Sequence, residues 1–184
     1  MLRRTFFRGL ALRGLAGWLG LAAVFGLPRP ARAIGRYRPG RRAEVDLLRC
    51  VKHERKLYAY RQGEVIMTFN VALGREPRGH KVQEGDGRTP EGRYYITAAR
   101  HDSDFHLSLK ISYPDAADRA RARALGVHPG GQIMLHGLDP GIEAEWHDRH
   151  WLFNWTNGCI AVTNPEMEVL WDSVALGTPI EIIA

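Results

Sequence analysis

The chain has 184 residues, the length of a single domain. Hydrophobic residues make up 45% of it and charged residues 25%, which is typical of a globular protein with one core. Its net charge of +6 comes from the first 33 residues, which hold six arginines and no acidic residue. The remainder balances 20 basic residues against 20 acidic ones, so charge gives no reason to expect nucleic acid as a partner.

The first 33 residues have the features of an export signal. A basic start leads into an apolar run over residues 14–27, and a small-residue cleavage site ends at Ala33. The paired Arg3 and Arg4 also fit a twin-arginine signal, and the run of 14 apolar residues is short for a membrane span. We therefore expect a periplasmic or other cell-envelope protein with a signal peptide over 1–33, a linker over 34–43 and one domain over 44–184.

From residue 44 onward, strand patterns dominate the sequence. Residues 56–60 and 65–73 flank a turn at Gly63, which predicts a hairpin, and the second of these strands alternates apolar residues with others. After a glycine-rich loop over 74–92, further strands are predicted at 93–98, at 132–135 and at 180–183.

Two short helices are predicted between these strands. The first covers 114–125, stops at Gly126 and presents mostly alanine, so it should lie shallowly on the surface. The second begins at Asn164 as its cap and places apolar side chains at helical spacing over 167–174. The fold predicted from these patterns is mostly β with two or so short α-helices.

A histidine and a cysteine carry the chemical signal. The apolar run 132–135 should deliver His136 at the end of a buried strand, and Gly158 allows a tight turn just before Cys159. A thiol needs a base to react as a thiolate, so a nearby His136 should lower the pKa of Cys159 below the ordinary value of about 8.5. Backbone N–H groups in such a turn can stabilise an oxyanion.

Structural roles explain the same residues individually. A Gly-Cys-Ile-Ala-Val string is often a core strand with a small buried cysteine, and a histidine at a strand end is often only structural. Cys50, the other cysteine, lies in a strand-like run, and the sequence leaves open a disulfide between Cys50 and Cys159.

Together, His136-Gly137 and Thr156-Asn157-Gly158-Cys159 resemble the motif of the L,D-transpeptidase (YkuD-type) catalytic domain, which is His-Gly, a variable stretch and then Ser/Thr-His-Gly-Cys. Residues 84–92 are similar to the Thr-Pro-x-Gly segment of that family. The resemblance covers 44–184. It implies a β-sandwich-like fold and a monomeric enzyme without a cofactor or metal that acts on peptidoglycan stem peptides.

In that family the cysteine attacks the carbonyl of a diamino acid, the histidine takes the thiol proton, and the carbonyl after the histidine orients the imidazole. A D-amino acid leaves, and the thioester passes to an amine, which forms a cross-link, or to water. The resemblance thus implies the catalytic residues Cys159, His136 and Gly137 and the oxyanion or substrate-binding residues Trp155, Thr156, Asn157 and Gly158.

Two positions depart from the family pattern. The usual histidine before Gly-Cys is Asn157, and the Arg or Asn often found two residues after the cysteine is Ala161. The gap of 19 residues between His136 and Thr156 is also long. These departures are similar to a branch in which some members hydrolyse, either as L,D-carboxypeptidases or at the link between the wall and a lipoprotein.

Three further readings stay open. The aromatic stretch from Trp146 to Trp155 is either a substrate wall over the cysteine or a packing loop. A zinc hydrolase is a second reading, and its ligands would be His136, His147, His150 and Cys159. The third is a non-catalytic wall-binding module with an inert cysteine. Basic side chains that could meet substrate carboxylates, although solvated surface charge is their more usual role, are Arg88, Arg93 and Lys110.

Overall fold

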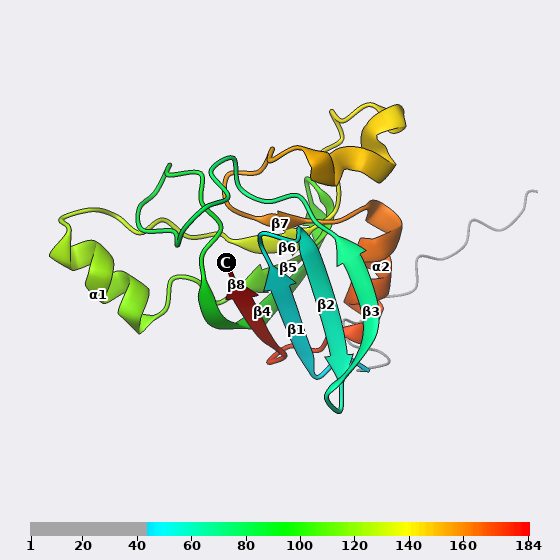
Figure 1. The fold of residues 1–184 in the computed structure, drawn as a ribbon, viewed down its shortest axis with the longest axis horizontal. Helices are drawn as coiled ribbons and strands as arrows, with labels where there is room; N and C mark the ends of the chain where they lie inside the picture. The colour runs from blue at the N-terminus through cyan, green and yellow to red at the C-terminus, as the bar shows by residue number, and fades with distance from the viewer. Residues whose placement is uncertain (1–43) are drawn as a thin grey trace, which may run out of the picture. The chain divides into compact units, whose positions relative to one another are not determined.

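The structure, a computed structural model, describes residues 44–184, so the predicted signal peptide and linker lie outside the described residues. Eight strands form one sheet in the order β3-β2-β1-β8-β4-β5-β6-β7 (Figure 1). The strands are β1 Leu47–Val51, β2 Lys56–Arg61, β3 Glu64–Asn70, β4 Gly92–Ser103, β5 His106–Ile111, β6 Met134–His136, β7 Ile160–Ala161 and β8 Pro179–Ile183. The helices are α1 Ala116–Ala124, the 3-10 helix η1 Ala144–Leu152 and α2 Asn164–Ser173.

The sheet folds back on itself at β4. This strand of 12 residues pairs with β8 through residues 92–95 and with β5 through residues 96–103, with register irregularities in the second half. Farther along, Ala72 and Ala161 exchange two backbone hydrogen bonds of 2.9 Å, which join the segment after β3 to β7. The curled sheet encloses the apolar core between its two halves, and the predicted mostly-β, sandwich-like fold is confirmed.

Helix α2 fills the space beside the second half of the sheet. Its apolar stripe is buried as predicted, with Met167, Leu170 and Trp171 at most 1% exposed. The predicted cap was wrong, because Thr163 and not Asn164 caps the helix and forms a capping box with Glu166. The Asn164 side chain instead accepts a hydrogen bond of 2.8 Å from the Leu138 N–H, just after the His136-Gly137 pair.

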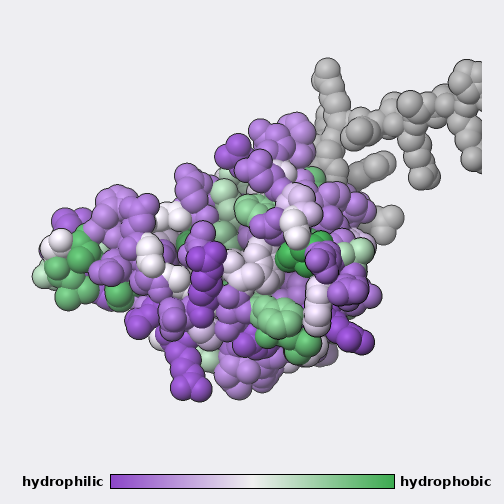
Figure 2. Space-filling model, turned by 90° about the horizontal axis from the view of Figure 1, so that it is seen from above, coloured by the Kyte–Doolittle hydropathy of each residue, from purple (hydrophilic) through white to green (hydrophobic). Residues whose placement is uncertain are grey.

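The surface elements follow the sequence less closely. The hairpin turn at Gln62 and Gly63 has the expected positive φ angles of 52° and 84°. However, Val65 and Ile66 are 47% and 40% exposed, because β3 is an outer strand of the sheet whose first half lies beyond the core. The face in Figure 2 is mostly hydrophilic, with hydrophobic residues in separate small patches.

The helices on the surface are short. Helix α1 buries only Asp118 and Ala122, as expected of a shallow helix, and η1 was not predicted. Among residues 44–184, no helix has the length and apolar character needed to cross a membrane.

Cys50 is a core residue. It lies in β1, is fully buried, and both it and Cys159 are free thiols, so the disulfide left open by the sequence is not formed. Burial raises the pKa of the Cys50 thiol to about 12, against a smaller lowering by Lys52, so this sulfur is protonated and unreactive.

We predict that Cys50→Ala lowers the free energy of unfolding by about 1–2 kcal/mol, because it leaves a small cavity, and keeps the activity of the folded protein. Urea denaturation and an activity measurement at 25 °C check the two halves of this prediction. Loss of activity in a variant that is still folded would contradict it.

Candidate active site

Cys159 follows a turn that only glycine can complete. Gly158 has a φ of +126°, and a Cβ atom added there would lie 2.6 Å from the carbonyl oxygen of Arg88. The Thr156 hydroxyl closes the turn, since it donates to the Cys159 carbonyl at 2.8 Å and accepts from the Gly158 N–H at 3.1 Å. The turn therefore holds the half-buried Cys159 in one position at the start of β7.

His136 is the last residue of β6 and is 2% exposed. Its Nδ1 lies 2.7 Å from the Gly137 carbonyl oxygen. Because a carbonyl only accepts, Nδ1 carries the proton and Nε2 of the neutral ring is free to take one. Phe105 stacks on the ring at 4.5 Å between centroids, and the Trp155 indole meets it edge-on at 5.6 Å.

The pairing of β6 with β7 brings the two residues to one face of the sheet. The strands are parallel, with Leu135 opposite Ile160 and His136 opposite Ala161. Leu135 and Ile160 are buried in the core, so their neighbours His136 and Cys159 point to the other face. There both line a cavity of about 230 Å³.

The thiol and the imidazole share this cavity without a hydrogen bond between them. Within residues 44–184, the hydrogen bonds of the Cys159 sulfur are from the Met134 N–H at 3.4 Å and to the Gln132 carbonyl at 3.6 Å. A thiol that donates to a carbonyl is protonated, so the resting sulfur is a neutral S–H group.

The charges of the site agree with a neutral resting pair. Burial raises the pKa of the Cys159 thiol, although the Met134 N–H and the charge of Lys81 act against it. Burial also lowers the pKa of His136 to about 4, against smaller raising effects of Gly137 and Asp139. The expected fall of the thiol pKa was therefore wrong, since desolvation outweighs the groups that favour a thiolate.

Arg100 is a site residue that sequence reasoning missed. The β4–β5 hairpin forms part of the cavity wall and contributes Arg100, Asp102 and Asp104. Across the sheet Arg100 pairs with Ser108, and Ser108 pairs with His136, so the three lie side by side. Only this three-strand register places Arg100 in the cavity. The predicted basic residues Arg88, Arg93 and Lys110 are not part of its lining.

The loop before β4 supports the cysteine turn from behind. Thr89 is fully buried, and its hydroxyl accepts the Gly74 N–H at 3.0 Å. Asp86 accepts from the Lys81 ammonium at 2.7 Å and from three backbone N–H groups of the same loop. Burial alone would raise the pKa of Asp86, but these hydrogen bonds together lower it by more, so the net shift of the pKa is downward. The charged carboxylate thus holds the loop against Gly158.

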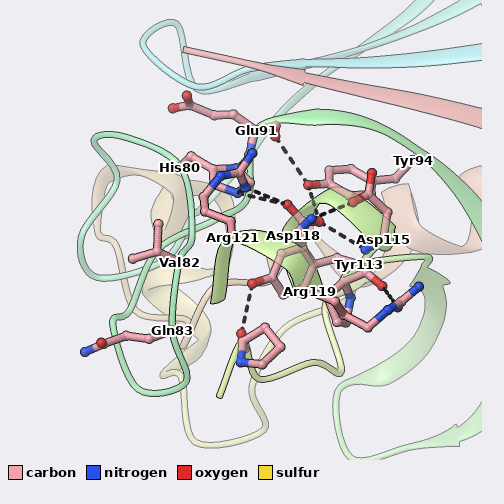
Figure 3. A network of polar contacts seen from close by, with 12 residues as sticks. His80, Val82, Gln83, Glu91, Tyr94, Tyr113, Asp115, Asp118, Arg119 and Arg121 are labelled. Carbon is pink, nitrogen blue, oxygen red and sulfur yellow. Dashed lines mark hydrogen bonds and ion pairs between the residues drawn. The ribbon is translucent and has the colours of Figure 1, made fainter. Parts of the chain in front are cut away.

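A buried polar network fixes the same loop to α1 (Figure 3). At its centre, Asp118 accepts from the Tyr94 hydroxyl at 3.0 Å and lies 3.0 Å from Nε2 of His80. Arg121 approaches the same carboxylate at 3.0 Å. Because Nδ1 of His80 accepts the Glu91 N–H at 3.0 Å, the histidine joins the loop to the helix. The network explains why a polar residue of the shallow helix is buried.

The histidines of the aromatic stretch do not form a metal site. Nε2 of His147 is bound to the Ile142 carbonyl at 2.9 Å, and Nδ1 of His136 is bound to Gly137. In the part of the chain that the structure describes, no three His, Cys, Asp or Glu side chains are grouped so that they could hold a metal. The arrangement does not favour the zinc reading.

A family model confirms the resemblance. The model of the L,D-transpeptidase catalytic domain matches residues 41–182, which contain all of the site described above. The chain belongs to this family. A search of curated proteins found no match.

Several solved structures share the fold. The helical cell shape determining protein Pgp2 from Campylobacter jejuni is similar with a TM-score of 0.57 and 22% identity, over 75% of this chain and 47% of that one. Bd1075 from Bdellovibrio bacteriovorus is similar with a TM-score of 0.55 and 23% identity, over 74% of this chain and 47% of that one. An L,D-transpeptidase from Mycobacterium smegmatis is similar with a TM-score of 0.51 and 16% identity, over 77% of this chain and 59% of that one. The chain therefore spans about half the length of the first two.

The positions that depart from the L,D-transpeptidase motif differ in their surroundings. Asn157 is exposed, and its side chain makes no polar contact with the residues the structure describes, whereas Ala161 is fully buried in the pairing with His136. The catalytic roles of the predicted residues stay predictions.

Two buried histidines should make the domain sensitive to acid. Burial lowers the pKa of His136 to about 4, and it lowers that of His150 to about 4 as well. Between about pH 6.5 and 4 the unfolded chain binds these protons and the folded chain does not, so stability falls as the pH falls. We expect the free energy of unfolding to fall by about 2 kcal/mol per histidine between pH 7 and pH 5.

Urea unfolding at the two pH values measures this loss. His150→Leu should remove about half of the pH dependence, whereas His101→Gln, at an exposed position, should leave it unchanged. An unfolding free energy that is the same at pH 7 and pH 5 in the wild type would contradict the assignment of both histidines as buried and neutral.

Proposed function

We propose that the chain is a cysteine-dependent peptidoglycan L,D-transpeptidase. The observation that carries the proposal is the shared cavity, in which a thiol and a buried imidazole with a free Nε2 lie on one face of paired strands. Family membership supports the same chemistry. The substrate is a stem peptide of peptidoglycan, and the place of action is the cell envelope, in keeping with the export signal expected over residues 1–33.

The reaction begins from the neutral pair. As the Cys159 sulfur attacks the carbonyl of the diamino acid, its proton passes to Nε2 of His136, and the Gly137 carbonyl stabilises the imidazolium through Nδ1–H. The peptide C–N bond breaks, and His136 returns the proton to the leaving D-amino acid. A thioester on Cys159 remains. An incoming amine then attacks this thioester and regenerates the thiol.

The oxyanion is stabilised by the cysteine turn. The Gly158 N–H is already bound to Thr156, so the donors left for the oxygen are the N–H groups of Asn157 and Cys159, which make no other hydrogen bond among residues 44–184. The Trp155 indole lies against the imidazole edge-on but is not part of the lining of the shared cavity. Arg100 bonds Asp102 at 3.4 Å in the same lining, and it is the arginine there that would exchange this contact for a carboxylate of the stem peptide.

Hydrolysis is the second candidate, and the surroundings of the cysteine favour it. Exposed Asn157 and buried Ala161 replace two side chains that could bind an acceptor. Without them, water is a stronger competitor for the thioester. The enzyme would then trim stem peptides as a carboxypeptidase or release a lipoprotein linked to the wall.

Mass spectrometry of muropeptides incubated with the purified protein tests the proposal. The wild type should release a D-amino acid and form cross-linked dimers, whereas trimmed monomers alone would favour the hydrolase. Cys159→Ala should abolish both products, and His136→Ala should slow them at least 100-fold, as expected for loss of a general base. Cys50→Ala is the matched control and should stay active. Turnover by folded Cys159→Ala would refute the proposal, as would an iodoacetamide-inert Cys159, the mark of a non-catalytic binding module.

A further inference from the structure

A second cavity lies beside the active site, on the connection between β6 and β7. Its volume is about 400 Å³, and its walls are Trp146, His150, Phe153, Trp155 and residues 141–143. Trp146 and Phe153 meet edge to face at 5.3 Å between centroids and are 38% and 50% exposed. We call this cavity the aromatic cleft. Large aromatic side chains usually bury most of their apolar surface in a core or an interface, so two partly exposed rings at a cavity wall indicate a binding surface.

The inner wall of the aromatic cleft contains polar atoms without partners. His150 is 1% exposed, yet neither of its ring nitrogens has a hydrogen-bond partner within residues 44–184, and the same holds for Nε1 of Trp155. The two rings are neighbours, 6.4 Å apart between centroids. A buried polar atom without a partner destabilises the folded state, so such a cluster requires an explanation.

The hydrogen-bonding properties of these atoms indicate which kind of ligand would fit the cleft. Burial keeps His150 neutral at pH 7, so one of its nitrogens donates and the other accepts, while Trp155 donates. The one formal charge in the lining of the aromatic cleft is that of Glu143, which would repel the carboxylates of a stem peptide. The matching ligand is uncharged, has an apolar face for the aromatic rings, and carries both donors and acceptors.

An N-acetylated sugar has these properties. The C–H groups of its ring form an apolar face, its hydroxyl groups donate and accept, and its acetamido group adds a donor, an acceptor and a methyl group. We propose that the aromatic cleft binds an N-acetylhexosamine of the glycan strand that carries the stem peptide. This inference rests on the proposed function, because it assumes a peptidoglycan substrate. Because His150 and Trp155 line the cleft while these nitrogens are buried, a side chain of the cleft must move for the sugar to bond them.

The position of the aromatic cleft fits such a substrate. Trp155 lines the cleft and also contacts the His136 ring, so a single side chain stands between the sugar site and the imidazole. Three residues of extended stem peptide span about 10 Å, which is the length between a sugar and the carbonyl of the third residue. One substrate can thus occupy both cavities, with its sugar in the aromatic cleft and its scissile carbonyl at Cys159.

Two substrates that differ only in the sugar test the proposal. With the wild type, kcat/KM for a disaccharide-tetrapeptide should exceed that for the free tetrapeptide at least tenfold. Trp146→Ala should reduce this ratio to about one. Trp151→Ala is the matched control, because Trp151 belongs to the same 3-10 helix but binds the Asp148 carbonyl and is not part of the lining. The ratio of the two kcat/KM values for Trp151→Ala should equal that of the wild type.

Equal kcat/KM values for the two substrates in the wild type would overturn the sugar site and leave the proposed function intact. If neither substrate is turned over, the proposed function fails, and the aromatic cleft is tested alone by titration with tri-N-acetylchitotriose while the indole N–H signal of Trp155 is followed by NMR. A shift in the wild type that Trp146→Ala removes supports the site. No shift, or a shift caused by the free tetrapeptide and not by the sugar, overturns it.

Discussion

The parallel pairing of β6 with β7 is the constraint on which the site depends. Strands of only three and two residues carry it, and it places His136 and Cys159 on the same face of the sheet. A parallel pair requires a crossover of a dozen or more residues, so a long connection must join β6 to β7, and here 19 residues separate His136 from Thr156. That crossover contains η1 and the aromatic cleft. The same connection thus permits the pairing of the two strands and forms the surface beside it.

The rest of the fold holds this pairing in place. Gly158 packs on the Arg88 carbonyl, and the loop that contains Arg88 is fixed by Asp86 and, through His80, by the network around Asp118. On the other side, the Asn164 side chain closes over Gly137, where a Cβ would lie 2.5 Å from its oxygen. The neutral resting state follows from this enclosure, because burial penalises both the thiolate and the imidazolium.

Local patterns made much of this predictable. The stripe on α2, the turn at Gly63 and the need for glycine at position 158 follow from spacing and residue type. The structure bears out these features because each depends on neighbours in the sequence.

The features that the sequence did not reveal depend on tertiary contacts. Thr163 and Asn164 are both good caps, and the choice between them was decided by the Leu138 N–H, which engages Asn164. Arg100 reaches the cavity only through the register of three strands, and Val65 is exposed because its strand is an outer one. The raised pKa of Cys159 depends on burial, which a sequence motif does not encode.

The central claim is that His136 acts as the base for a neutral Cys159, and the pH dependence of iodoacetamide alkylation at Cys159 tests it most directly. In the wild type the imidazole removes the proton during attack, so alkylation at pH 7 should be at least ten times faster than in His136→Ala. The ratio of the two rates should fall as the pH rises above 7, because an increasing fraction of the thiol then ionises without the imidazole. Identical profiles for the two proteins over this range would contradict the account and remove His136 from the mechanism.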